Sequence, residues 1–476
     1  MRRGLKTETT FYGAAKYGTI LITLLTAAVL ARVLTPADYG VVTVVTVFTA
    51  LFSVLSDMGL GAAIIQKKDL SDEQTNDIFS FSVYCAMLMA LVFFLLGFPI
   101  AAFYRQRVYQ RICAILSVSV FFNAVNIIPN SLMLKRKRFA LVGMRLIVTA
   151  LLAGIFAVVL ALSGASFYTL VFQSVFQSVA IFLWNFWGSG LKFRLRFQMR
   201  SVQMVRQFSA YQFSFSIINY FARNLDNLLI GKVMGDESLG YYDKGYRLMM
   251  YPIQNLTYVI NPIIHPILSD YQNEKRIIYD SYMKIARVLS LLGVVISAGC
   301  FSCSREIILL FFGRQWEASI PVFQLLCISV WPQMVSSSAG SIYQSMGNTK
   351  LMFQSGMIHF GVSILCIIVG VISKNLQTLA LLVSVGLYLR FFIDYYFLIK
   401  KCFSFSYRAF LNAFRNDLLI ALALAAAVIL LANIDLPGLI WNLLAKGSAI
   451  CLLFFVMLLL TKEWGKLVSL IRSWKT

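Results

Sequence analysis

The sequence predicts an all-α polytopic membrane protein with about fourteen transmembrane helices, arranged as two six-helix lobes and two further C-terminal helices. Two observations support this class. Of the 476 residues, 59% are hydrophobic and only 13% are charged, which is about half the charged share of an average soluble protein. Apolar runs of about 20 residues also recur along the chain, and this is the length that a helix needs to cross the hydrocarbon core.

The individual spans follow from apolar windows between polar breaks. The first window follows a basic stretch, and we interpret it as a retained transmembrane helix because the same pattern recurs in every later window. The connections are short, and none could hold a soluble catalytic domain. The predicted spans are 11–31, 41–64, 78–103, 112–134, 140–162, 166–188, 209–231, 246–268, 283–304, 319–346, 351–373, 376–399, 417–433 and 438–461.

The basic residues predict the orientation of these spans. The formal net charge of +22 would suggest a nucleic-acid partner in a soluble protein, but here the charge follows the membrane topology and no such partner is expected. Twenty-five of the 42 lysines and arginines fall in the connections on the side of both termini, against ten on the opposite side. Cytoplasmic connections carry this excess, so both termini are predicted to be cytoplasmic.

An internal repeat with an offset of 200 residues relates the two predicted lobes. The segment "ARVLTPADYG" (31–40) aligns with "GKVMGDESLG" (231–240), so that Gly40 corresponds to Gly240. The spans before these turns carry polar residues with the same spacing of 4, 3, 4 and 3, at positions 12, 16, 19, 23 and 26 and again 200 residues later. Such steps keep one helix face continuous.

This repeat and the basic connections define the predicted domains. The N-lobe is 1–191, an interfacial linker is 192–207, the C-lobe is 208–399, a second linker is 400–416, and two extra spans occupy 417–461. The last residues, 462–476, place Trp464, Leu467 and Trp474 on one face and basic residues on the other. This pattern predicts a short amphipathic helix at the interface, with docking to a partner protein as the alternative.

Charged residues inside the predicted spans are the candidate functional residues. In the stretch "FSFSIINYFARNLDNLLIGKVMG", Arg223 and Asp226 lie well inside an apolar run and are spaced to pair with each other. A charge in hydrocarbon costs roughly 3 kcal/mol or more, so such residues usually face a bundle interior or a watery cavity. Lys16 belongs to the equivalent polar stripe of the first span. We therefore expect Lys16 and Arg223 to border a cavity.

Other buried charges have a structural explanation as well as a functional one. Arg145 could snorkel to the cytoplasmic surface, and Arg390 with Asp394 could form a packing ion pair. Asp57 follows a polar stripe on the second span, and the glycines after it could serve helix packing. Arg247 begins a polar face on the eighth span. Because basic groups outnumber acidic ones, the sequence predicts a cationic cavity that suits an anionic or amphipathic cargo.

The local motifs resemble a known family of exporters. "VLARVLTPADYGVVTVVTVFTALFSVLSDMGLGAAIIQKKDLS" and "NLDNLLIGKVMGDESLGYYDKGYRLMMYP" are similar to the starts of the two lobes of Wzx-type lipid-linked oligosaccharide flippases, members of the polysaccharide transporter family in the MOP superfamily. "LLFFGRQWEASIPVFQLL" and "YQSMGNTK" resemble later parts of the same family. The resemblance covers about 1–400, and within the family it favours the colanic-acid and related capsule exporters.

The resemblance implies a MOP/MATE-like fold and alternating access across the bacterial inner membrane. The implied cargo is an undecaprenyl-diphosphate-linked oligosaccharide for capsule, colanic acid or O-antigen. Its diphosphate would contact Lys16, Arg223 and Arg247, with Arg145 and Arg390 as further candidates. Asp226, Asp57 and Asp394 would serve as charge partners or in coupling to H⁺ or Na⁺. No metal or other cofactor is expected, and a polysaccharide polymerase and chain-length machinery are the implied protein partners.

Several rival functions remain open at this point. A peptidoglycan lipid II flippase or a drug/cation antiporter would use the same fold for another cargo, although an antiporter of cations should carry carboxylates in its cavity. A polymerase or ligase of the same pathway would need a large catalytic loop. A receptor or scaffold would not need the repeat or the buried charges.

Overall fold

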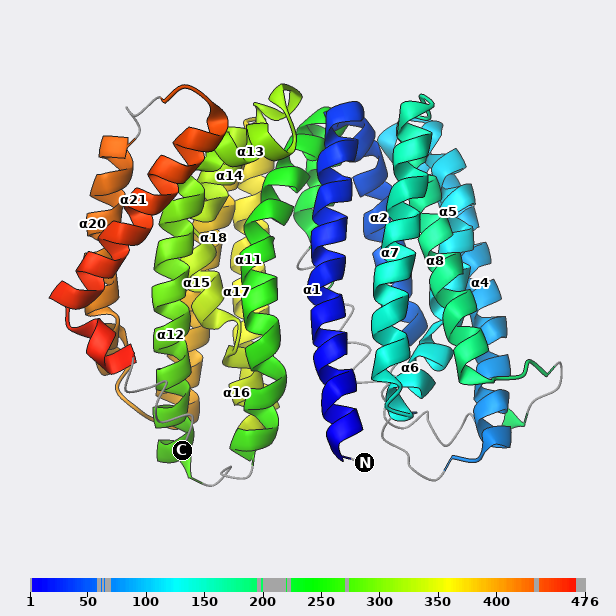
Figure 1. The fold of residues 1–476 in the computed structure, drawn as a ribbon, viewed down its shortest axis with the longest axis horizontal. Helices are drawn as coiled ribbons and strands as arrows, with labels where there is room; N and C mark the ends of the chain where they lie inside the picture. The colour runs from blue at the N-terminus through cyan, green and yellow to red at the C-terminus, as the bar shows by residue number, and fades with distance from the viewer. Residues whose placement is uncertain are drawn as a thin grey trace. The chain divides into compact units, whose positions relative to one another are not determined.

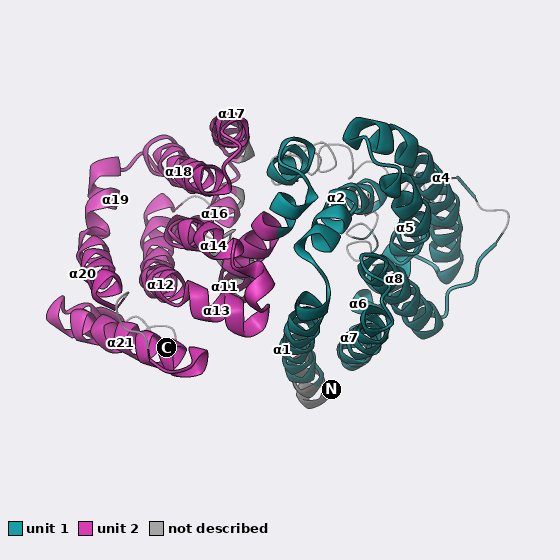
Figure 2. Ribbon diagram, turned by 90° about the horizontal axis from the view of Figure 1, so that it is seen from above, with its two compact units in different colours: residues 1–240 teal, residues 241–476 magenta. Residues whose placement is uncertain are grey.

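The computed structural model describes residues 2–57, 61, 64, 70–194, 198–199, 220, 224–269, 274–431 and 436–467. Within these ranges the protein is α-helical without β-strands, and it divides into two compact units, 1–240 and 241–476 (Figure 1, Figure 2). Ten of the described helices are long and apolar enough to cross a membrane, or twelve when each of two bent pairs is one span. The predicted all-α polytopic class is confirmed, and the count of fourteen spans stays a prediction.

The described part of unit 1 is a bundle of mostly long helices. Helix α1 packs along α7, where the small side chain of Ala15 faces Gly143, and α4 packs along α5. Small residues at such interfaces let helix backbones approach closely in lipid. The helices of this unit are α1 (Arg2–Val33), α2 (Pro36–Asp57), α4 (Asp72–Tyr104), α5 (Val108–Val125), α6 (Ile127–Lys135), α7 (Phe139–Leu162) and α8 (Tyr168–Ser189).

Local sequence explains where α4 begins and ends. Ser71 and Gln74 form a reciprocal capping box, in which each side chain accepts a hydrogen bond from the other residue's backbone N–H at 3.0–3.1 Å. At the other end Arg105 adopts a left-handed conformation, with φ of 59°, and closes the helix. These signals place the polar turns at the ends of one 33-residue helix.

The start of the second repeat packs on the first within unit 1. Helices α2 and α11 (Asp236–Ser269) begin at Pro36 and Asp236, which the sequence repeat aligns. A Cβ atom on Gly40 would collide with the backbone carbonyl of Asp236, and one on Gly240 would collide with the carbonyl of Pro36. The contact is therefore reciprocal between equivalent residues, and glycine is required at both positions because only it leaves room for the facing backbone.

Unit 2 contains the rest of α11 and the remaining helices. These are α12 (Lys275–Ser302), α13 (Ser304–Phe311), α14 (Ser319–Cys327), α15 (Val330–Ser336), α16 (Ala339–Ser345), α17 (Thr349–Ile372), α18 (Leu376–Tyr395), α19 (Tyr407–Ala413), α20 (Arg415–Leu431) and α21 (Leu439–Leu460), with short segments η1 (Arg314–Trp316) and η2 (Tyr396–Phe403). Helices α12, α15 and α18 pack together, and α20 and α21 pack on α12 (Figure 1).

The predicted tenth span, 319–346, is broken rather than continuous. Helices α14 and α15 meet at a bend of 47°. Pro332 explains the break, because proline has no N–H and clashes with the carbonyl four residues earlier, at Ile328. The Tyr388 hydroxyl donates to that carbonyl at 3.1 Å, and Ser297 donates to the carbonyl of Cys327 at 2.7 Å. Neighbouring helices thus satisfy the freed backbone groups, which the bilayer requires.

The predicted lobe boundary and the compact units divide the chain at different places. The units meet after Gly240, whereas the linker predicted from the repeat is 192–207. The difference arises because the segment 224–240 packs on unit 1, as the glycine contacts above describe. The predicted domains concern the repeat and stay a prediction. Most of the predicted seventh span, 209–231, lies outside the described residues.

Candidate functional site

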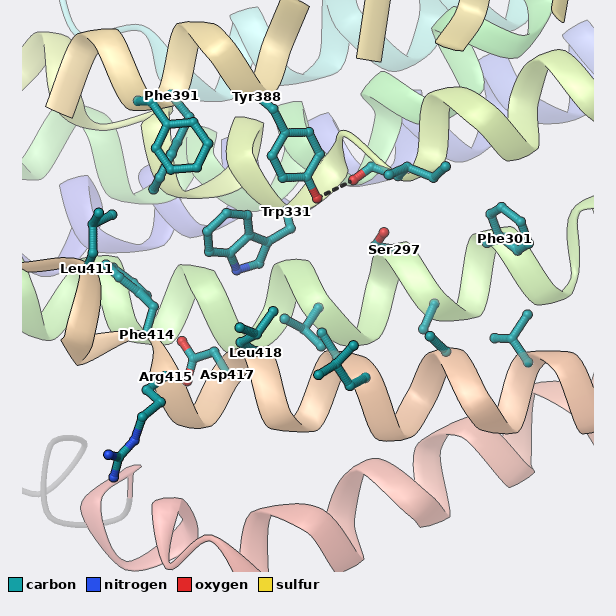
Figure 3. Close-up of a pocket in the computed structure, with 18 of the residues that line it drawn as sticks. Ser297, Phe301, Trp331, Tyr388, Phe391, Leu411, Phe414, Arg415, Asp417 and Leu418 are labelled. Carbon is teal, nitrogen blue, oxygen red and sulfur yellow. Dashed lines mark hydrogen bonds between the residues drawn. The ribbon is translucent and has the colours of Figure 1, made fainter. Parts of the chain in front are cut away.

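An apolar groove in unit 2 has a volume of about 790 Å³ (Figure 3). One wall is formed by α12 and the aromatic side chains of α15 and α18, and the other by α19 and α20. The lining residues include Ser297, Phe301, Trp331, Tyr388, Phe391, Leu411, Phe414, Asp417, Leu418, Ala421, Leu422, Ala425 and Ile429. Such a surface is suited to an apolar chain rather than to a polar molecule.

Trp331 forms the centre of the aromatic wall. Its ring lies 5.0 Å from that of Phe391 and 6.1 Å from that of Tyr388. Its indole N–H donates to the Ser290 hydroxyl at 2.8 Å, so the polar edge of the ring is satisfied by α12 while its face stays in the groove. Figure 3 shows Trp331 and Tyr388 side by side, with the Tyr388 hydroxyl bonded to the backbone at the break. The helix break therefore positions this wall.

The wall contributed by α20 combines small and exposed apolar side chains. Ala421 and Ala425 leave room along the groove, and Leu418 and Leu422 lie beside them and are 61% and 59% exposed. From Arg415 to Ile429 the helix rises about 21 Å, which is most of the roughly 30 Å hydrocarbon core. The groove therefore extends along most of α20, with exposed leucine side chains beside it.

The groove ends in a polar cluster at the start of α20. Asp417 is 1% exposed and accepts a hydrogen bond from Ser290, the residue that also holds Trp331. The guanidinium of Arg287 lies 4.0 Å from the Asp417 carboxylate. In Figure 3 the Arg415 side chain points away from the aromatic wall. The end of the groove near Phe414 thus meets charged groups, while the end near Phe301 is apolar.

Two ion pairs fasten α21, and with it α20, to the rest of unit 2. Lys446 on α21 lies 2.6 Å from Glu306 on α13, and both side chains are nearly inaccessible. Beyond the other end of α21, Glu463 lies 2.5 Å from Arg287 of α12 and also accepts from Asn416 at 2.8 Å. Burying apolar surface gives little drive for helix association in lipid, so these polar contacts set the position of the groove wall.

The structure places the site residues predicted for unit 1 in different environments. Lys16 is half-buried on α1, and Arg145 is 7% exposed on α7. Arg145 donates to Asn130 and Asn185 at 2.8 and 2.9 Å, so it is a buried hydrogen-bonded group and does not snorkel. Asp226 is 6% exposed. Arg223 and the side chain of Asp57, at the end of α2, lie outside the described residues.

The predicted residues of unit 2 both form ion pairs along their own helices. Arg247 lies 2.7 Å from Asp243, and its side chain is still 60% exposed. Arg390 lies 3.4 Å from Asp394, as the packing alternative expected, and is 41% exposed. The sequence reasoning did not find the groove, because α20 has the composition of any apolar span. The proline in "VWPQMV" and the aspartate at the start of α20 were the available signals.

Comparison with known proteins identifies the family. Residues 29–321, more than half of the chain, match the family described as "Polysaccharide biosynthesis protein". The chain belongs to this polysaccharide biosynthesis protein family. It is 25% identical over 403 residues to the lipopolysaccharide biosynthesis protein WzxC of Escherichia coli. The matched region covers 82% of this chain and 79% of WzxC. It is 23% identical to the teichuronic acid biosynthesis protein TuaB of Bacillus subtilis over 64% of each chain, just under two thirds of TuaB.

Solved structures show which fold the family member adopts. The lipid II flippase MurJ, in an inward closed conformation, matches with a TM-score of 0.72 at 13% identity, over 95% of this chain and 99% of MurJ. An inward-facing multidrug resistance MATE transporter of the MOP superfamily matches with a TM-score of 0.62 at 12% identity, over 79% and 92%. The predicted MOP/MATE-like fold is confirmed.

Proposed function

We propose that this family member is a flippase that moves undecaprenyl-diphosphate-linked oligosaccharide repeat units across the bacterial inner membrane, for the assembly of a surface polysaccharide. The observation that carries the proposal is the apolar groove along α20. A cargo with a long isoprenoid tail needs an extended apolar surface on the protein, and the groove offers one along most of α20, with an aromatic wall around Trp331. The names of WzxC and TuaB support a surface-polysaccharide cargo.

The charged part of the cargo needs cations. We assign diphosphate binding to Lys16, Arg223 and Arg247, as the family resemblance implies. Arg247 supports this role because its pair with Asp243 leaves most of the guanidinium side chain exposed. The buried hydrogen bonds of Arg145 support a positioning role for that residue within unit 1. We place both termini in the cytoplasm because of the distribution of basic residues. We also propose that a polymerase and chain-length machinery act on the repeat unit after its export.

Export in a strain that lacks this gene tests the proposal. Wild type should restore surface polysaccharide and remove the lipid-linked repeat units that accumulate inside. Ala425→Trp, which fills the groove, should reduce export at least tenfold, as expected when an apolar cargo group loses most of its burial. Ala426→Trp is the matched control, because Ala426 is exposed on the same helix but does not line the groove.

Variants of the assigned basic residues test the diphosphate contacts independently of the identity of the cargo. Arg223→Ala and Lys16→Ala should insert normally but fail to export, and Arg223→Lys should retain part of the activity. If wild type does not restore export, the cargo assignment is wrong, and a lipid II or drug substrate becomes the better explanation. If wild type restores export and every cation variant does so equally, the assigned diphosphate contacts are wrong.

A further inference from the structure

A second cavity of about 330 Å³ lies on α12, on the side that faces the segment after α21. Its polar lining consists of Lys284, Arg287, Lys466 and Glu463, and apolar residues such as Met283 and Leu291 complete it. The cavity belongs to unit 2 and is separate from the groove along α20. Three cations and one carboxylate around an apolar floor make an amphipathic site whose lining is net positive.

The sequence places this cavity at a membrane interface. Helix α12 is 28 residues long, about 42 Å, so it exceeds the roughly 30 Å hydrocarbon core by about two turns. Its first turns carry Lys275, Arg276 and Asp280, and its apolar run follows them. On the other side, the apolar run of α21 ends at Leu460. Lys284 and Lys466 therefore lie where two membrane-crossing helices leave the hydrocarbon.

The backbone after α21 turns to build this site. Lys462 adopts a left-handed conformation, with φ of 58°, and the next residue, Glu463, is 2% exposed. Its carboxylate lies 2.5 Å from Arg287 and 2.8 Å from Lys466, which holds the two cations in the cavity wall. Trp464 packs edge-on against Phe455, with ring centroids 5.3 Å apart. A tryptophan at this level is typical of the membrane–water boundary.

Among the residues that the structure describes, three cations and one carboxylate line the cavity. Glu463 pairs with both Arg287 and Lys466, and Asp417, 4.0 Å from Arg287, lies on the groove side of that residue. Lys284 is exposed, and no hydrogen bond or ion pair joins it to another described residue. An anionic group in the cavity would complete the site, and basic pockets between helices at this depth bind lipid headgroups.

We propose that this cavity binds the phosphate headgroup of an anionic membrane phospholipid. Lys284 and Lys466 contact the phosphate, Arg287 supplies the fixed positive charge behind it, and Met283 and Leu291 contact the start of an acyl chain. In the orientation proposed above, the lipid belongs to the cytoplasmic leaflet. The site does not depend on the identity of the transported cargo. Because Arg287 also contacts Asp417 at the end of the groove, a bound lipid stabilises the position of α20.

Lipid binding to the purified full-length protein tests the proposal. Native mass spectrometry in detergent would measure the affinity for phosphatidylglycerol and for zwitterionic phosphatidylcholine. We expect the double variant Lys284→Gln, Lys466→Gln to lower the phosphatidylglycerol affinity by about tenfold or more, since each basic residue near an anionic lipid surface contributes roughly fivefold to the affinity. Phosphatidylcholine binding should change less than twofold.

A matched double variant controls for net charge. Lys350→Gln with Lys400→Gln removes the same charge from exposed positions of unit 2 outside the cavity, and it should leave phosphatidylglycerol affinity within twofold. The double variant Lys284→Arg, Lys466→Arg should retain phosphatidylglycerol binding. That result would show that the glutamine double variant loses affinity through its loss of charge and not through misfolding. Equal losses in the two glutamine doubles would mean general surface attraction and would overturn the proposal.

Two further ligands distinguish the source of the phosphate. Inorganic phosphate at millimolar concentration should not displace phosphatidylglycerol, because it lacks the acyl chain that the apolar floor contacts. Displacement by inorganic phosphate would instead indicate a soluble-anion site. Displacement of one phosphatidylglycerol by one polyprenyl diphosphate would assign the cavity to the cargo, and either result would overturn the assignment to a membrane phospholipid.

Discussion

Gly40 lies directly against the backbone carbonyl of Asp236, and the equivalent residue Gly240 lies against the carbonyl of Pro36. The two contacts are related by the 200-residue repeat, so each helix start packs on the other in the same way. Tyr109 and Gln106 reinforce the contact by donating hydrogen bonds to the Asp236 carboxylate. The two glycines that the repeat aligns therefore make equivalent contacts, and each has a defined steric role.

Alanine at either glycine should disrupt this contact. Gly40→Ala and Gly240→Ala each force a Cβ atom into a facing backbone, and overpacking of this kind costs about 1–3 kcal/mol or more. We expect both variants to unfold at a lower temperature in detergent. Gly18→Ala is the control, because nothing lies within 4 Å of the new methyl group and alanine favours the helix. Equal stability of Gly40→Ala and Gly18→Ala would contradict the close approach.

The ion pair between Lys446 and Glu306 should be important for the attachment of α21. Removing one partner, as in Lys446→Met, leaves a buried charge without compensation and should lower the free energy of unfolding by about 3–5 kcal/mol. The double variant Lys446→Met, Glu306→Met should recover most of this loss. Breaking the exposed pair of Arg276 and Asp280 should cost less than about 1 kcal/mol. Denaturant unfolding in mixed micelles measures the free energy of unfolding of all three variants.

Tyr388, whose hydroxyl donates to the free carbonyl at the helix break, should contribute to stability through this hydrogen bond as well as through packing. Tyr388→Phe leaves the carbonyl of Ile328 without its donor and should lower the free energy of unfolding by about 1–3 kcal/mol. Tyr407→Phe removes a hydroxyl that donates to Phe392 at an exposed position, and water can replace it. Thermal unfolding of the two variants tests this role of Tyr388, because Tyr388→Phe should lose more stability than Tyr407→Phe.

Acidification should loosen the segment after α21. Burial raises the pKa of Glu463, but hydrogen bonds from Lys466, Asn416 and Arg287 outweigh burial and hold the pKa below its usual value. Because the folded pKa is lowered, this stabilisation is present above the unfolded pKa of about 4.3 and is lost as the pH falls through the folded value. Protease cleavage after α21 should therefore increase below about pH 4, and Glu463→Gln should remove that pH dependence.

Sequence reasoning recovered the features that are local along the chain. Apolar spans and the repeated glycines could be predicted because apolar runs, turn glycines and polar stripes involve neighbouring residues, as at Gly40 and Gly240. The helix ends differed by up to ten residues, since α11 begins at Asp236 and the predicted span begins at 246. The hydrogen-bond partners of Arg145 could not be predicted, because Asn130 and Asn185 come from two other helices and have no fixed spacing from Arg145 along the chain. The groove depends on the packing of α20 against Trp331, and no sequence period encodes it. The predicted roles of Lys16, Arg223 and Arg247 stay predictions.

Translocation in proteoliposomes tests the central claim most directly. The purified protein would be reconstituted with a fluorescent undecaprenyl-diphosphate oligosaccharide, and the fraction reaching the opposite leaflet would be measured over time for wild type, Ala425→Trp and Ala426→Trp. We predict protein-dependent translocation that Ala425→Trp slows at least tenfold and Ala426→Trp leaves unchanged, because only the first substitution fills the groove. Translocation at the wild-type rate by Ala425→Trp would contradict the role of the groove, and no protein-dependent translocation at all would contradict the proposed flippase.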